Sequence, residues 1–89
     1  MKSKFGQLVK TIQQLKNKKE IEDFLRGILT PKELEEISTR LQIVKMLQDG
    51  IPQHKIAEKL NVGVATVTRG SREIKLGRFW QLSSLWRNK

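Results

Sequence analysis

Residues 53 to 75, QHKIAEKLNVGVATVTRGSREIK, constrain the fold of this chain more than any other segment. Apolar side chains recur there at the spacing of two short helices, with a polar break at Asn61, a residue type that accepts the left-handed backbone of a tight turn. We expect one helix from about Gln53 to Leu60 and a second from about Val64 to Arg72. The side chains expected to face inward are Ile56, Ala57, Leu60, Val62 and Val67. This pattern predicts a helix-turn-helix.

The outward face of the second helix carries small, hydroxylic and cationic groups. These residues are Gly63, Val64, Ala65, Thr66, Thr68, Arg69 and Arg72. Small groups near the helix start let the backbone approach base edges in the major groove, and arginine can hold guanine or phosphate. The front of the first helix adds Gln53, His54 and Lys55 as candidates for contacts with the DNA backbone. The segment therefore predicts binding to double-stranded DNA.

The charge of the chain favours a polyanionic partner. It has 18 Lys and Arg against 9 Asp and Glu, which gives a formal net charge of +9. Residues 1–19 contain six basic side chains and no acid, and residues 50–89 contain eight basic and two acidic side chains. Nucleic acid is the natural partner of such a distribution, and the alternative is a solvated basic surface.

The remaining sequence predicts further helices. Apolar residues at helical spacing in 5–15 and 21–28 indicate two amphipathic helices. Thr30, Pro31 and Glu33 have the spacing of a helix cap, a first-turn proline and a capping box, so a third helix is expected from there to about Gln48. No alternating strand pattern is present, and the expected fold class is all-α.

A chain of 89 residues forms one domain at most and buries a small fraction of its surface alone. The apolar residues of the third helix cover two sides, so its second side is expected to pack on another copy of the chain. The expected organisation is a helical dimerisation core at 1–48, the helix-turn-helix at 53–72 and a C-terminal helix at 77–89, whose two tryptophans we expect to be docked.

Several function classes are disfavoured by what the sequence lacks. Cysteine is absent and His54 is the single histidine, so we expect no metal site and no catalytic pair, and hence no enzyme. No apolar run exceeds two residues, which argues against a transmembrane helix, and residues 1–19 lack the apolar stretch of a secretory signal. The chain is therefore expected to be a soluble cytoplasmic protein without contact to a membrane.

Three segments carry a resemblance to a known family. LTPKE at 29–33, TRLQIVKML at 39–47 and above all VGVATVTRGS at 62–71 resemble the tryptophan repressor family of bacterial regulators. The resemblance covers about half the chain, from Leu29 to Lys75. It implies an intertwined all-helical homodimer whose two reading heads enter successive major grooves of a near-palindromic operator.

The resemblance also implies L-tryptophan as a corepressor, held between the core and the reading head. Arg40 and Arg69 match the arginines that flank the indole ring, and Arg69 would also pair with the ligand carboxylate. The implied ligand residues are Thr30, Arg40, Val44, Arg69, Gly70 and Glu73. Thr30 would lie beside the carboxylate, and Gly70 would leave room for the ligand.

The sequence leaves some alternatives open. Glu73 stands where the family has a small serine, and its carboxylate could pair with the ligand ammonium or fill the pocket instead. Arg40 could make a structural ion pair, and Arg69 could grip phosphate only. The predicted function is a sequence-specific DNA-binding transcriptional repressor with L-tryptophan as corepressor. The alternative is an effector-independent helical module that binds nucleic acid or another protein.

Overall fold

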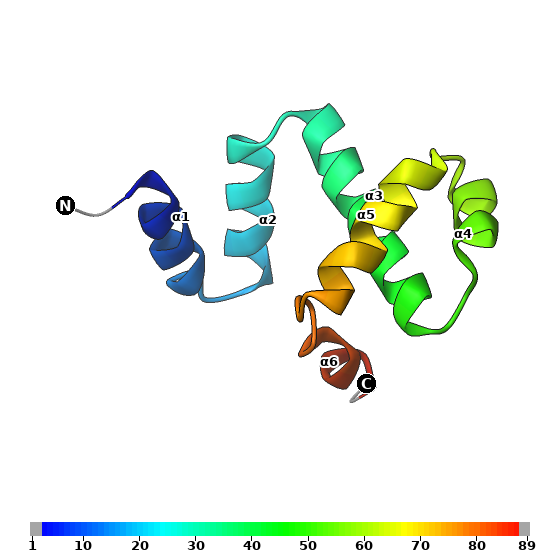
Figure 1. Ribbon diagram of the computed structural model, residues 1–89. Coiled ribbons are helices and arrows are strands. Elements are labelled where there is room, and N and C mark those ends of the chain that lie inside the picture. Colours follow the sequence, from blue (N-terminus) through cyan, green and yellow to red (C-terminus); the bar gives the residue numbers. More distant parts are fainter. Residues whose placement is uncertain (1–2, 88–89) are drawn as a thin grey trace. The chain divides into compact units, whose positions relative to one another are not determined.

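The computed structural model describes residues 3–87, which contain six α-helices and, over that range, no strand (Figure 1). The helices are α1 (Lys4–Gln13), α2 (Lys18–Ile28), α3 (Pro31–Gln48), α4 (Gln53–Leu60), α5 (Val64–Lys75) and α6 (Leu82–Arg87). The expected all-α fold class is confirmed. The chain divides into two compact units, one ending at Glu35 and the other beginning at Glu36, so α3 runs across their boundary.

The first three helices begin at side-chain caps. Oxygens of Ser3, Asn17 and Thr30 each accept a hydrogen bond from the backbone amide three residues later, at 2.9, 2.9 and 3.1 Å. At α3 the backbone amide of Thr30 also donates to Oε1 of Glu33 at 2.8 Å, which completes the expected capping box. These caps satisfy amides that a helix start otherwise leaves without a partner.

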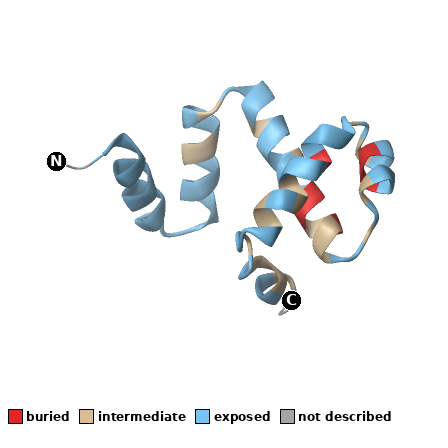
Figure 2. Ribbon diagram, in the orientation of Figure 1, coloured by how far each residue is buried: buried red, intermediate tan, exposed pale blue. Residues whose placement is uncertain are grey.

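The apolar stripe of α1 is exposed to solvent, whereas that of α2 is half-buried at Phe24 and Leu25. Neither helix contains a fully buried residue. Phe5 is 73% exposed, and the apolar side chains of the following turns are also exposed, as the pale blue of Figure 2 shows. Burial of such stripes normally provides most of the stability of an amphipathic helix. Within its own compact unit, α1 therefore leaves its apolar stripe uncovered.

The hydrophobic core lies in the unit from Glu36 onward, where α3, α4 and α5 meet (Figure 2). Its buried members are Ile43, Met46, Ile56, Ala57 and Val67, with Leu47, Ile51, Leu60 and Val62 partly buried around them. All five residues that the helix-turn-helix pattern assigned to the interior are in this set. Ile56 and Val67 are completely buried, which fixes α4 and α5 to each other and to α3.

The turn between α4 and α5 has left-handed backbone at one residue. Asn61 has φ 55° and ψ 50°, as expected for Asn in a tight turn. The amide of Val62 donates to the carbonyl of Ala57 at 3.0 Å, and the amide of Asn61 donates to the carbonyl of Glu58. This pair of bonds is a Schellman motif, which ends α4 and directs the chain into α5.

Replacing Asn61 tests this turn. Asn61→Ala is expected to lower the free energy of unfolding by about 1 kcal/mol, because a β-carbon disfavours left-handed backbone. Asn61→Gly is the matched control and is expected to stay within about 0.5 kcal/mol of the parent, because glycine adopts this conformation readily. Urea unfolding at one protein concentration measures both. Equal losses for the two variants would contradict the backbone explanation.

The C-terminal segment differs in detail from the expectation. α5 continues to Lys75, three residues beyond the expected end, and α6 covers only Leu82–Arg87 of the expected 77–89. Gly77 and Phe79 both have left-handed backbone, and this irregular segment separates α5 from α6. Trp86 is partly buried, with Nζ of Lys45 5.7 Å from its ring centroid, whereas Trp80 is 76% exposed and lies outside the core. Residues 88–89 lie outside the described part.

Within residues 3–87, none of the helices combines the length and the apolar character that crossing a membrane requires.

Candidate nucleic-acid interface and adjoining pocket

The outer face of α5 is exposed along its first two turns. The solvent-exposed residues there include every member of the set predicted from the sequence: Gly63, Val64, Ala65, Thr66, Thr68, Arg69 and Arg72. Val67, on the opposite face, is completely buried. The burial of Val67 therefore determines which side of α5 is presented to solvent.

The two helices of the helix-turn-helix begin differently from the first three. No side chain caps α4 at Pro52 or α5 at Gly63, and neither helix has an acidic residue in its first turn. Free amides and the positive end of the helix dipole favour an anion at such a helix start. Both starts are thus suited to phosphate oxygens, with Gly63 and Ala65 too small to obstruct them.

A hydrogen bond links the fronts of α4 and α5. The hydroxyl of Thr68 donates to Oε1 of Gln53 at 2.8 Å. Gln53 is partly buried, whereas His54 and Lys55 beside it are exposed. The predicted DNA-contacting residues of α4 and α5 therefore lie on adjoining surfaces, and Gln53 also has a structural partner.

The cations of α4 and α5 are free of carboxylate partners in the described part of the chain. The ion pairs found there join Lys18 to Glu22 and Arg78 to Glu73. Arg69 and Arg72 take part in neither, although both belong to the predicted contact face. Their guanidinium groups are available to an external anion, which raises the positive potential at this surface.

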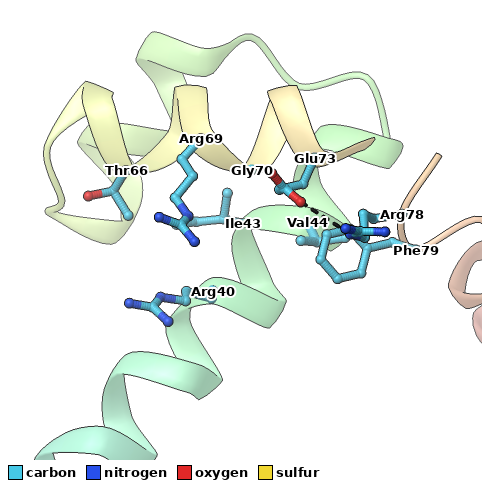
Figure 3. Close-up of a pocket in the computed structure, with 9 residues that line it drawn as sticks. All are labelled: Arg40, Ile43, Val44, Thr66, Arg69, Gly70, Glu73, Arg78 and Phe79. Carbon is cyan, nitrogen blue, oxygen red and sulfur yellow. Dashed lines mark ion pairs between the residues drawn. The ribbon is translucent and has the colours of Figure 1, made fainter. Parts of the chain in front are cut away.

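A pocket of about 350 Å³ lies between α3 and α5 and beside the turn that follows α5 (Figure 3). Its lining residues are Arg40, Ile43, Val44, Thr66, Arg69, Gly70, Glu73, Arg78 and Phe79. Five of the six predicted ligand residues are among them. The volume is at the lower end of the range for small-molecule sites and suits a ligand the size of one amino acid.

The charged groups of the pocket come from three elements. Arg40 extends from α3, and Arg69 extends from α5 on the facing side, with Ile43 and Val44 of α3 between them and the far end (Figure 3). At that far end Glu73 pairs with Arg78. The pocket therefore has an apolar floor with guanidinium groups at one end and an acid-base pair at the other.

The packing of α5 against α3 leaves little space for a side chain at Gly70. A β-carbon built there would lie 3.2 Å from Cγ2 of Ile43 and 3.4 Å from Cδ1 of Leu47. The first distance is tighter than ordinary van der Waals contact, and Ile43 is only 1% exposed. The close approach of α5 to α3 thus already accounts for Gly70, in addition to any room that it leaves for a ligand.

The turn after α5 supplies two pocket residues that the sequence did not predict. Gly77 has φ 96°, its amide donates to the carbonyl of Ile74, and the amide of Arg78 donates to the carbonyl of Glu73. This second Schellman motif ends α5 and changes the direction of the chain. Arg78 and Phe79 consequently line the pocket, and Nε2 of Gln48 donates to the carbonyl of Phe79 at 3.0 Å.

Thr30 belongs to the other compact unit. Its hydroxyl caps α3, and its amide is held by Glu33. Its expected place beside a ligand carboxylate stays a prediction.

Comparison with known proteins identifies the family. The chain matches the Trp repressor protein family over residues 3–80. It is 44% identical over 69 residues to a Trp operon repressor homolog of Mannheimia succiniciproducens, an alignment that covers 76% of this chain and 68% of the relative. It is 36% identical over 74 residues to the homolog of Vibrio cholerae and 39% identical over 74 residues to that of Photobacterium profundum, covering 82% of this chain and 72% of the relative in both cases.

No solved structure shows significant similarity to the chain. The family match spans most of the chain, including the helix-turn-helix and the pocket. The predicted family is confirmed, and with it the predicted class of function. This chain belongs to the Trp repressor protein family and is a DNA-binding transcriptional repressor, not an enzyme.

Proposed function

We propose that this repressor acts as a cytoplasmic homodimer, binds a near-palindromic operator in double-stranded DNA and takes L-tryptophan as its corepressor. The observation that carries the proposal is the position of the pocket. It lies directly behind the exposed face of α5 and is lined by α3 on its other side. A ligand there would touch both the core and the reading helix.

The DNA-binding part rests on three properties of α4 and α5. The starts of both helices are uncapped, the exposed residues of α5 are small or cationic, and Arg69 and Arg72 are unpaired within the described residues. We assign base-edge contacts to the first turns of α5 from Gly63 to Arg69. We assign backbone contacts to Arg72 and to the front of α4, at Gln53, His54 and Lys55.

The corepressor part rests on the chemistry of the pocket. A planar indole ring fits between Arg40 and Arg69, because guanidinium groups stack on aromatic faces and gain cation–π energy there. Val44 and Gly70 offer apolar contact, and Thr30 remains a proposed partner of the carboxylate. A ligand that prefers one angle of α5 relative to α3 would shift the reading head toward that angle.

The homodimer rests on uncovered apolar surface. The exposed large apolar residues of α1, α2 and α3 are Phe5, Leu8, Val9, Ile12, Ile21, Ile28, Ile37 and Leu41. Extensive apolar surface of this kind marks an interaction site. A second copy is the proposed partner, since two reading heads would match the two half-sites of a palindrome.

Operator binding is tested with Arg69→Ala and Thr66→Ala. Duplex from the promoter region of the gene is expected to bind more tightly than random duplex at physiological salt, with affinity falling as salt rises. Arg69→Ala is expected to weaken operator binding about 5- to 150-fold, because one bidentate base contact is worth about 1–3 kcal/mol. Thr66→Ala is expected to cause a smaller loss.

The control is Lys32→Ala, which removes the same charge outside α4 and α5. Electrophoretic mobility shifts at several salt concentrations measure all three variants. Equal binding of promoter and random duplex by the parent chain would overturn sequence-specific recognition. Preference for single-stranded RNA over duplex would favour an RNA-binding module instead.

The corepressor is tested by calorimetric titration with L-tryptophan and by operator binding with and without it. Bound L-tryptophan is expected to raise the affinity for operator DNA at least about fivefold, which is the lower end of typical allosteric coupling. Absence of heat together with unchanged operator affinity at millimolar ligand would leave a repressor that needs no effector.

A further inference from the structure

The turn after α5 has a strained backbone at a pocket residue. Phe79 lines the pocket with φ 64°, in the left-handed region that a bulky side chain rarely adopts. Gly77, two residues earlier, is also left-handed, which glycine tolerates. Strained backbone persists only where its surroundings hold it, and it is frequent at ligand clamps and switch segments. Residues 77–79 thus form a strap whose shape depends on the contacts that hold it.

Two side chains, one from α3 and one from α5, hold the strap. Nε2 of Gln48, at the end of α3, donates to the carbonyl of Phe79 at 3.0 Å, a contact between residues 31 positions apart. Oε1 of Glu73 on α5 lies 3.3 Å from Nε of Arg78 (Figure 3). The strap is therefore attached to both helices that form the sides of the pocket.

Both attachments are easily released. The Arg78 side chain is 68% exposed, so water and salt screen its ion pair with Glu73. Gln48 is only half satisfied, because its Oε1 is buried and finds no donor within residues 3–87. A buried acceptor without a partner is unfavourable, and it gains a partner when it meets water. Opening the strap would therefore relax the backbone of Phe79 and hydrate Gln48, while breaking one hydrogen bond and one screened ion pair.

We propose that the strap is a gate for the effector pocket, which Gln48 holds closed and which opens for the effector to enter and leave. This inference rests on the proposed function, since the pocket is the proposed effector site. Gly77 is the hinge, and Arg78 and Phe79 are the lining residues that move with it. Gln48 is not among the residues that line this pocket, so it is a positioning residue that acts through Phe79.

Gln48→Glu is the first test, because an ionised carboxylate has the shape of the amide but cannot donate to the carbonyl of Phe79. In the full chain it is expected to raise both the association and the dissociation rate of L-tryptophan about fivefold, the effect of losing one hydrogen bond from the closed strap. The dissociation constant is expected to stay within about twofold of the parent value, because the free and the bound chain lose the same contact. NMR exchange spectroscopy with isotope-labelled L-tryptophan measures the rates, and calorimetry measures the dissociation constant.

Gln42→Glu is the matched control, since it makes the same change on an exposed face of α3 and outside the pocket. It is expected to leave both rates as in the parent chain. A residue that merely supports the pocket would raise the dissociation rate alone and weaken binding. That result for Gln48→Glu, or rates equal to those of the parent chain, would overturn the proposal.

Phe79→Gly and Phe79→Ala give a second test that leaves Gln48 in place. Both variants remove the ring, but only alanine has the β-carbon that disfavours left-handed backbone. The closed strap is therefore expected to be more stable with glycine, so that both rates are about 5- to 30-fold lower than with alanine. Equal rates in the two variants would contradict the strain at Phe79 on which the gate depends.

Native-state hydrogen exchange tests the strap without effector. The amides of Arg78 and Val62 close equivalent turns, each with a bond of 3.0 Å to the carbonyl five residues earlier. The Arg78 amide is expected to exchange at least about tenfold faster, at a rate that low urea does not change, since a local opening exposes little surface. Equal protection of the two amides would contradict a mobile strap. Fast exchange at Arg78 in a chain that binds no L-tryptophan would contradict the effector site, not the movement of the strap.

Discussion

Ala65→Glu is expected to lower operator affinity by 100-fold or more while leaving the fold as stable as before. Ala65 is exposed in the first turn of α5, where no side chain caps the helix. A carboxylate there would lie in the space proposed for DNA, close to the negatively charged phosphates. Placing like charges together costs several kcal/mol, and about 2.7 kcal/mol is enough to lower binding affinity 100-fold.

The same substitution should not harm the helix. An acidic side chain near a helix start interacts favourably with the helix dipole, by about 0.3–1 kcal/mol. Urea unfolding is therefore expected to show equal or greater stability, which separates loss of DNA binding from loss of fold. Gln81→Glu, at an exposed position outside the helix-turn-helix, is the control for the added charge. Unchanged operator binding by Ala65→Glu would place the DNA elsewhere on the protein.

Ile56→Ala is expected to lower the free energy of unfolding by about 2–5 kcal/mol, the cost of removing a buried aliphatic side chain and leaving a cavity. Ile56 is 0% exposed and belongs to the cluster that joins α3, α4 and α5. Small domains have a total stability of about 5–15 kcal/mol, so this variant approaches the limit of folding.

Ile56→Val provides the graded control, with an expected loss of about 0.5–1.5 kcal/mol. Thermal and urea unfolding at one fixed protein concentration measure both variants, because the apparent stability of an oligomer depends on concentration. Losses that do not increase from Val to Ala would contradict a close-packed core at this position.

The helix-turn-helix could be predicted because its signals are local. The polar break at Asn61 and the apolar positions around it determine both helices within a few residues, and the structure places them at Gln53–Leu60 and Val64–Lys75. The capping box at Thr30 was predictable for the same reason, since the cap and its partner are three residues apart. Family membership followed from motifs in these same segments.

The wall of the pocket made by Arg78 and Phe79 could not be predicted in this way. It depends on two left-handed residues, Gly77 and Phe79, on either side of Arg78, and the second is a bulky residue that rarely adopts such backbone. A contact 31 residues away, from Gln48 to the carbonyl of Phe79, accompanies this conformation. Glycine at 77 was a visible sign that α5 ends, but not of where the chain then goes.

The hydrogen bond between Thr68 and Gln53 restricts what Thr68 can recognise. A hydroxyl has a single hydrogen to give, and here it is directed at Oε1 of Gln53. Only the lone pairs of Thr68 then remain for DNA, so it can accept from the amino groups of adenine or cytosine but cannot donate to guanine or to phosphate oxygen. The amide nitrogen of Gln53 keeps both its hydrogens free. Toward DNA, Gln53 can therefore donate hydrogen bonds, whereas Thr68 can only accept them.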